Sequence, residues 1–255
     1  MSTPPRLVPP LLRISPTAME TWTTCARKFL LRHLLGITPS DAGPPSDEGL
    51  RLHAVLRFVH DHGSCHDAAF VDETLVAHGC ATDAMRVRMA RHRDRCPSTA
   101  DASRHEVERA RYHHRPVPMF LATARIDAIW VHDGIFDVRD YKSGGLSPME
   151  LRDDIRAQVQ AWVLAPRAAA MGARLQLRYE YLAPEIVEDP EVWEPDADDL
   201  DAVEERLRSE VEAIHGSDFT GVAEATVCAR CQYRSVCSQS AAPGAPTWPV
   251  LGIEA

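Results

Sequence analysis

The segment 121–145 most constrains the fold, because it predicts two strands joined by a tight turn. Asp133-Gly134 stands between runs of alternating apolar residues, and Asp-Gly in that setting is one of the strongest short signals for a hairpin. A two-residue loop fixes the register of the strands. Counting back from the turn places Asp127 directly opposite Asp140.

The same register places Arg125 opposite Lys142, and alternation along a strand puts all four charged residues on one face. We expect that face to be the one that packs on the core, because it also carries apolar residues. Facing carboxylates repel, since their side-chain carbons lie only roughly 4.5–5.5 Å apart. A divalent cation between Asp127 and Asp140 removes the repulsion, so the hairpin predicts a metal site with an adjacent lysine. The alternative is a surface hairpin with incidental charges.

Three cysteines near the C-terminus, Cys228, Cys231 and Cys237, have the spacing C-x2-C-x5-C. We expect a cytoplasmic chain without a signal peptide, and close thiols in such a reducing compartment favour a metal site over disulfides. Structural zinc and cubane iron–sulfur clusters both take four ligands. Cys25 is the candidate fourth ligand, which would join the first helix to the C-terminal region. On spacing alone the other cysteines are possible substitutes: Cys65, Cys80 and Cys96.

The order of elements predicts an α/β or α+β fold with a central mixed sheet, because helices precede a meander of strands and a further helix and strand follow. Ser15-Pro16 begins a helix that we expect to reach about Leu35, and a long helix is expected from Pro148 to about Met171. We expect a flexible N-terminus over 1–14, one domain over 15–240 and a flexible tail over 241–255. No apolar run approaches the ~20 residues of a membrane span, so we expect a cytoplasmic protein without a membrane partner.

Several short motifs together resemble one known family, the RecB/AddB-like nucleases of the PD-(D/E)xK type, in the iron–sulfur branch that includes CRISPR-associated RecB-like exonucleases. The helix that contains Cys25 looks like the opening helix of these nuclease domains. The other motifs follow in the family's order: Gly49-Leu-Arg-Leu-His53-Ala, Ala124-Arg-Ile-Asp127, Asp140-Tyr-Lys142, Gln158-x3-Trp162 and the three C-terminal cysteines. The chain departs from the family pattern at Ala26, Ala124 and Trp162, which stand for Pro, Gly and Tyr.

The resemblance implies a restriction-endonuclease-like core with a central mixed sheet, N-terminal helices and an iron–sulfur staple. It implies that His53, Asp127 and Asp140, with the backbone carbonyl of Tyr141, hold Mn²⁺ or Mg²⁺. Lys142 would position the attacking water or stabilise negative charge in the transition state. Gln158 would orient Lys142 or the strand end. Cys25, Cys228, Cys231 and Cys237 would bind a structural [4Fe–4S] cluster, with Zn²⁺ as the alternative.

The function implied is that of a metal-dependent DNA exonuclease acting on single-stranded ends, in DNA repair or recombination or in CRISPR adaptation. A helicase or CRISPR adaptation proteins are the expected partners, since helicase motifs are absent from this sequence. Nine arginines between Arg86 and Arg115 could follow a phosphate backbone. One alternative is a non-catalytic or weakly active DNA-binding adaptor for a helicase or integration complex. Another, suggested by the net charge of -9, is a zinc-stabilised regulatory protein without a nucleic-acid partner.

Overall fold

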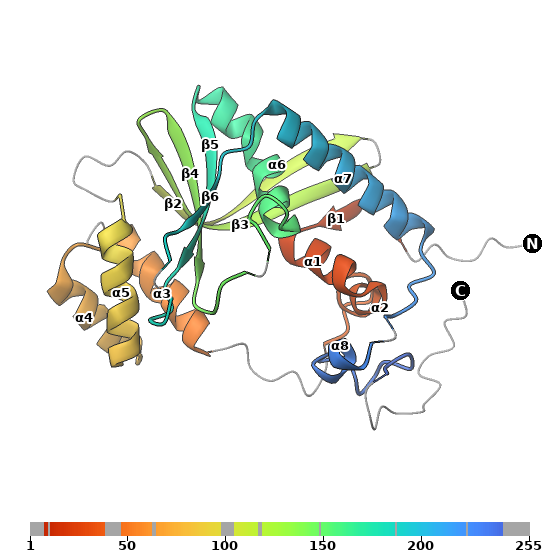
Figure 1. The fold of residues 1–255 in the computed structure, drawn as a ribbon, viewed down its shortest axis with the longest axis horizontal. Coiled ribbons are helices and arrows are strands. Elements are labelled where there is room, and N and C mark those ends of the chain that lie inside the picture. Colours follow the sequence, from red (N-terminus) through yellow and green to blue (C-terminus); the bar gives the residue numbers. More distant parts are fainter. Residues whose placement is uncertain are drawn as a thin grey trace, which may run out of the picture. The chain divides into compact units, whose positions relative to one another are not determined.

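Figure 1 shows the computed structural model, coloured along the chain. It describes residues 8–9, 11–38, 47–62, 65–97, 105–116, 119–147, 149–186, 188–222 and 224–241. The predicted N-terminal segment lies largely outside these residues, and the predicted tail lies outside them except for its first residue. The chain divides into two compact units, the first made of Met1–Gly43, His113–Ala122 and Glu204–Ala255, the second of Pro44–Tyr112 and Thr123–Val203. The single domain expected over 15–240 stays a prediction.

Four strands of the second unit form a mixed sheet. β4 (Ile135–Lys142) pairs antiparallel with β3 (Met119–His132) and parallel with β5 (Arg174–Tyr181), and β6 (Glu191–Trp193) pairs antiparallel with β5. β3 begins in the first unit, where its first residues pair in parallel with β1 (Leu12–Ile14), and β2 (His105–Pro116) also pairs with β3. The central position of β4 is what brings its polar C-terminal end against neighbours on both sides.

The turn between β3 and β4 has the predicted two-residue form. Asp133 and Gly134 have φ of 49° and 72°, and two consecutive positive φ angles define the type I′ turn whose twist matches the strands. Facing residues run from His132–Ile135 back to Ala128–Arg139, which is the register counted from the sequence. The predicted hairpin is therefore confirmed.

Both faces of this hairpin are buried, whereas the sequence predicts the core on the face of the two aspartates. The opposite face carries Trp130 and Tyr141, which pack with three helices of the second unit in one apolar cluster. These helices are α3 (Asp47–Asp61), α4 (Ala68–Ala77) and α5 (Asp83–Arg95). The aspartate face meets α6 (Ile155–Ala170), where Arg167 lies 5.7 Å from the ring of Phe136. Strict polar alternation fails here because buried acids and arginines pair with one another.

Two predicted helices have different bounds in the structure. The N-terminal helix is interrupted at Cys25, whose extended backbone (φ -166°, ψ 112°) separates α1 (Pro16–Thr24) from α2 (Ala26–Phe29) and the π-helical turn η1 (Leu30–Leu34). The helix expected from Pro148 begins only at Ile155, because Asp154 caps its first turn by accepting the Arg156 N–H.

The first unit combines N-terminal and C-terminal segments of the chain. Its C-terminal elements are α8 (Ala225–Ala229) and the end of α7 (Ala197–Gly216), which begins in the second unit. Trp22 donates from its indole to Glu210 (2.7 Å), and the Tyr233 hydroxyl donates to the carbonyl of Ile37 (2.9 Å). These bonds tie the opening helices to residues almost 200 positions later. No helix of the described chain is long and apolar enough to cross a membrane.

The turn gives a direct test of the register. Gly134→Ala should lower the free energy of unfolding by about 1–2 kcal/mol, because a β-carbon disfavours the left-handed conformation although no atom lies within 4 Å of it. Gly144→Ala is the matched control, since a β-carbon there also meets no atom and φ is not positive. Chemical denaturation measures both. Equal stability of the two variants would contradict the assigned turn.

Candidate functional site

Asp127 lies where the hairpin meets helix α3. The pairing places it opposite Asp140, one step beyond the ladder of β3 and β4. One carboxylate oxygen of Asp127 accepts the backbone N–H of Tyr141 (2.9 Å), and the other lies 3.2 Å from Nδ1 of His53. The structure therefore brings His53 to Asp127 across more than seventy residues of sequence, as the resemblance predicted.

Asp140 and Lys142 form the second half of the site. Lys142 Nζ lies 2.8 Å from Asp140 Oδ1 and 4.0 Å from the centre of the Tyr179 ring. An ion pair on one side and an aromatic face on the other hold the ammonium in place. The Tyr179 hydroxyl donates to Asp154 (2.9 Å), so the ring is itself fixed by the residue that caps α6.

A pocket of about 350 Å³ opens over these residues in the second unit. Its walls come from helix α3, the end of β4 and the loop that follows it, the first turn of α6 and the end of β5. The lining residues are His53, Asp140, Tyr141, Lys142, Ser143, Gly144, Gly145, Ser147, Arg156 and Tyr181. A cationic, glycine-edged pocket beside two carboxylates has room for a phosphate group and the charges to hold one.

Burial raises the pKa of Asp127, and the nearby Asp140 carboxylate raises it further. Hydrogen bonds from His53 and Tyr141 oppose the shift without cancelling it. The protein alone therefore compensates the negative charge of this carboxylate poorly. The donor set of one imidazole and two carboxylates suits Mn²⁺ or Mg²⁺, since both ions take oxygen ligands and imidazole favours Mn²⁺. His53, Asp127 and Asp140 therefore fit the divalent ion that the sequence predicts.

Gln160, a residue outside the predicted motifs, contacts Asp140. Gln160 Nε2 lies 3.4 Å from Asp140 Oδ2, whereas the Gln158 amide donates to the carbonyl of Arg152 (2.8 Å). Residues 157–164 of α6 are all buried, so the sequence pattern there does not show which glutamine faces β4. Trp162 is buried in the same helix, which fits packing rather than base stacking.

Tyr179, Asp154 and Arg156 are further residues of the site that the motifs did not reveal. Arg156 lines the pocket and bonds to Asp154 through its guanidinium (2.9 Å). Burial opposes ionisation of Asp154, but the bonds from Arg156 and Tyr179 outweigh it and lower the pKa of this carboxyl. A sequence signal existed only for Asp154, whose place before an apolar helical run is typical of an N-cap.

The arginines expected to follow a phosphate backbone are used by the protein itself where their side chains are described. Arg88 is buried against Glu48, and Arg91 donates to the carbonyl of Ala183. Arg95 donates to the carbonyl of Glu188. Arg104 and the side chains of the arginines in β2 lie outside the described residues. Arg88, Arg91 and Arg95 therefore hold α5 against other parts of the second unit.

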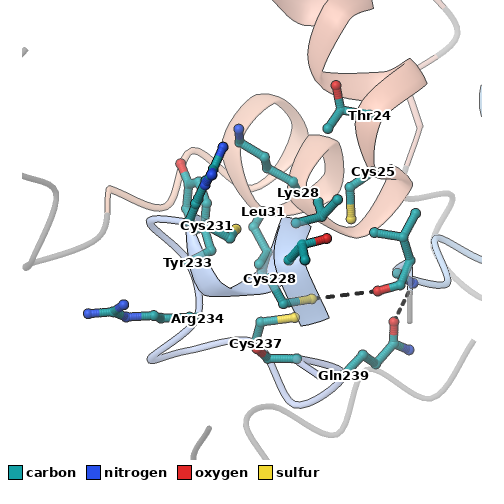
Figure 2. A pocket seen from close by; sticks show the side chains of 16 residues that line it. Thr24, Cys25, Lys28, Leu31, Cys228, Cys231, Tyr233, Arg234, Cys237 and Gln239 are labelled. Carbon is teal, nitrogen blue, oxygen red and sulfur yellow. Dashed lines mark hydrogen bonds between the residues drawn. The ribbon is translucent and has the colours of Figure 1, made fainter. Parts of the chain in front are cut away.

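The four predicted cysteines line a second pocket, of about 380 Å³, in the first unit. Figure 2 shows the sulfur atoms of Cys25, Cys228, Cys231 and Cys237 set around it. The break of the helix at Cys25 presents this thiol to the pocket, and α8 and the turns after it present the other three. The pocket could hold far more than one water-sized group, since about 10–15 Å³ suffices for a single water.

The electrostatics of this pocket oppose a free thiolate but suit an anionic metal–thiolate group. Burial raises the pKa of the Cys237 thiol, and the neighbouring Cys25 and Cys231 thiols raise it further. The side chains of Lys28, Arg230 and Arg234 line the same pocket. Thiolates bound to a metal ion or cluster carry the negative charge that these cations would balance.

Comparison with known proteins places the chain in one family. The family model described as PD-(D/E)XK nuclease superfamily matches residues 13–238. A solved structure titled "Crystal structure of SSO0001" is similar with 13% identity and a TM-score of 0.39, over 84% of this chain and 95% of that chain, which is too distant to bear on function. Among curated proteins, none matches the chain significantly.

The contact of Gln160 with Asp140 predicts an order of effects on metal binding. Gln160→Leu should weaken Mn²⁺ binding about 10-fold, the lower end of the usual cost of losing a residue that orients a ligand. Gln158→Leu is the matched control, because Gln158 is also a buried amide on the same helix. Isothermal titration calorimetry measures both affinities. A larger loss of Mn²⁺ affinity in Gln158→Leu would show that the contact from Gln160 does not orient Asp140.

Proposed function

The chain belongs to the PD-(D/E)XK nuclease superfamily, and we propose that it is a metal-dependent DNA exonuclease that degrades DNA from single-stranded ends. Membership confirms the expected α/β fold with a central mixed sheet, and it makes the chain a nuclease of a superfamily that uses divalent metal ions. The preference for single-stranded ends rests on the resemblance of residues 15–237 to RecB-like exonucleases.

The observation that carries the proposal is the convergence of His53, Asp127, Asp140 and Lys142 beside one pocket. Three of these lie on the hairpin and one comes from a separate helix. An incidental set of surface charges would not place an imidazole 3.2 Å from one partly buried acid and an ammonium 2.8 Å from the other. A non-catalytic adaptor would have no need to keep all four.

The protein's own residues divide the work of phosphodiester hydrolysis between them. His53, Asp127 and Asp140 would hold a divalent ion, which would supply Lewis-acid polarisation of the phosphate and lower the pKa of a bound water. Lys142, held between Asp140 and Tyr179, offers a fixed positive charge to the negative charge that grows in the transition state. Arg156 at the pocket wall can hold a phosphate oxygen.

Two substitutions test this assignment. Asp127→Asn and Lys142→Met should each lower kcat on end-labelled single-stranded DNA with Mn²⁺ by about 10²–10³-fold, the usual cost of losing one electrostatic stabiliser. The matched control is Asp133→Asn. Asp133 is an exposed acid of the same hairpin, and asparagine also tolerates its left-handed backbone conformation. We expect the control to cut like the wild type.

The same assay distinguishes the alternative functions. Wild-type protein that binds the oligonucleotide in a salt-dependent way but does not cut it would contradict the proposal and favour an adaptor. Protein that does not bind would favour a regulatory role without nucleic acid. Cleavage of a circular single strand at the rate of a linear one would support nuclease activity but contradict the assignment as an exonuclease.

We also propose that Cys25, Cys228, Cys231 and Cys237 hold a structural [4Fe–4S] cluster. A tetrahedral zinc ion draws its sulfur ligands to about 3.8 Å from one another. Among the described residues, these four cysteines do not form a group with all ligand atoms within 4.8 Å, although they line one pocket. A cubane separates its thiolates more widely, because iron and sulfide ions lie between them. The wider spacing supports the cluster over zinc.

The cluster predicts colour and iron content. Protein purified without oxygen should be brown, and Cys231→Ser should lose the colour and most of the iron, as measured by absorbance and metal analysis. Cys80→Ser is the matched control, since this buried cysteine lies in the other unit and should leave the colour unchanged. A colourless wild type that loses zinc in Cys231→Ser would assign zinc to the site instead.

A further inference from the structure

Four buried side chains outside both sites converge in the second unit. His60, Cys65, His92 and Cys96 each offer a ligand atom, and these atoms all lie within 4.8 Å of one another. Each side chain is at most 7% exposed. None of the four belongs to the nuclease motifs or to the cysteine pocket described above.

The distances within the group are close to those of a tetrahedral metal site. Nε2 of His60 lies 2.9 Å from Nε2 of His92 and 3.6 Å from Sγ of Cys96, and the two sulfur atoms are 3.2 Å apart. Zinc bonds of normal length set the edges of such a tetrahedron at about 3.3 Å for two nitrogens, 3.6 Å for nitrogen and sulfur, and 3.8 Å for two sulfurs. Small outward shifts of the side chains therefore make room for one ion.

The fold builds the group from two similar pieces of chain. His60 lies in the last turn of α3 and His92 in the last turn of α5. Each is followed shortly by its cysteine, in the spacings H-x4-C and H-x3-C, and Cys96 is the C-cap of α5. Two short ligand pairs separated by a longer loop are typical of structural zinc sites.

The surroundings orient one of the two imidazoles as a metal ligand requires. Nδ1 of His92 lies 3.5 Å from a carboxylate oxygen of Glu180, which is completely buried. Arg139 donates to the other oxygen of Glu180 (3.0 Å) and to the carbonyl of Arg95 (2.8 Å). A carboxylate behind the non-ligating nitrogen favours the tautomer in which the other nitrogen is free to bind metal.

Two other chemistries fit the group less well. A disulfide needs its sulfurs about 2.05 Å apart, which is far shorter than the 3.2 Å between Cys65 and Cys96. A [2Fe–2S] cluster with two cysteines and two histidines holds each pair on a different iron, roughly 5 Å or more apart. The 3.6 Å between His60 and Cys96 leaves no room for two irons.

We propose that His60, Cys65, His92 and Cys96 bind one structural zinc ion. Both thiols lose their protons on binding and both imidazoles remain neutral, so the charges of the two thiolates balance that of the ion. The ion joins the C-terminal ends of α3 and α5. It lies beside Tyr141, whose ring is 5.1 Å from that of His92 and whose backbone N–H holds Asp127. The zinc would therefore support the hairpin of the nuclease site from its opposite face.

Metal analysis of the full chain tests the proposal. Protein expressed with added zinc and desalted should contain about one zinc ion per chain. That zinc should remain in Asp127→Asn and in Cys231→Ser, which alter the two other sites. It should be lost from Cys65→Ala and from His92→Ala. Cys80→Ala is the matched control, because Cys80 packs in the same apolar cluster without belonging to the group.

A second measurement does not depend on whether the core variants fold. Cys231→Ser protein grown with cobalt in place of zinc should show the intense visible bands of tetrahedral Co²⁺ and the near-ultraviolet charge-transfer band of thiolate ligands. Folded wild-type protein without zinc after growth in zinc-supplemented medium would overturn the proposal. So would zinc that stays in folded Cys65→Ala but leaves Cys231→Ser, or a cobalt spectrum without thiolate bands.

Discussion

The register of one antiparallel pairing governs the second unit. The two left-handed residues at Asp133 and Gly134 permit a single alignment of β3 and β4, and a slip by one residue would turn every side chain to the opposite face. In this alignment two carboxylates stand opposite each other at the open end of the hairpin. Their mutual repulsion and partial burial are met by His53 from one side and Lys142 from the other. The site is thus a consequence of the register. A histidine from a helix and a lysine from the hairpin complete it.

Much of this could be predicted from sequence because short-range signals determine it. Asp-Gly between apolar residues specifies the turn, the turn specifies the register, and the register pairs Asp127 with Asp140. Long-range features depended on the resemblance, which placed His53 beside Asp127 although no local pattern connects them. The break at Cys25 could not be predicted, because the residues around it are compatible with an uninterrupted helix and only the tertiary structure draws its backbone into an extended conformation.

Another error arose because this sheet is buried on both faces. Alternation of apolar and polar residues indicates one wet face, yet the second face here is dry and carries ion pairs such as Arg139 with Asp137. Burial of residues 157–164 of α6 likewise removes the pattern that would distinguish Gln160 from Gln158. From spacing alone, the sequence presents Cys65 and Cys96 only as substitutes in a four-cysteine site. Their grouping with His60 and His92 becomes visible only when the ends of two helices are seen together.

Tyr141 shows what lies behind the variable letter of a D-x-K motif. Its neighbours Asp140 and Lys142 line the pocket, while its own ring points through the sheet into the core formed by α3, α4 and α5. Its main chain nevertheless holds an acid of the nuclease site. The position that a motif search treats as arbitrary is therefore restricted by volume and shape, and the choice of residue there transmits the packing of three helices to the alignment of a metal ligand.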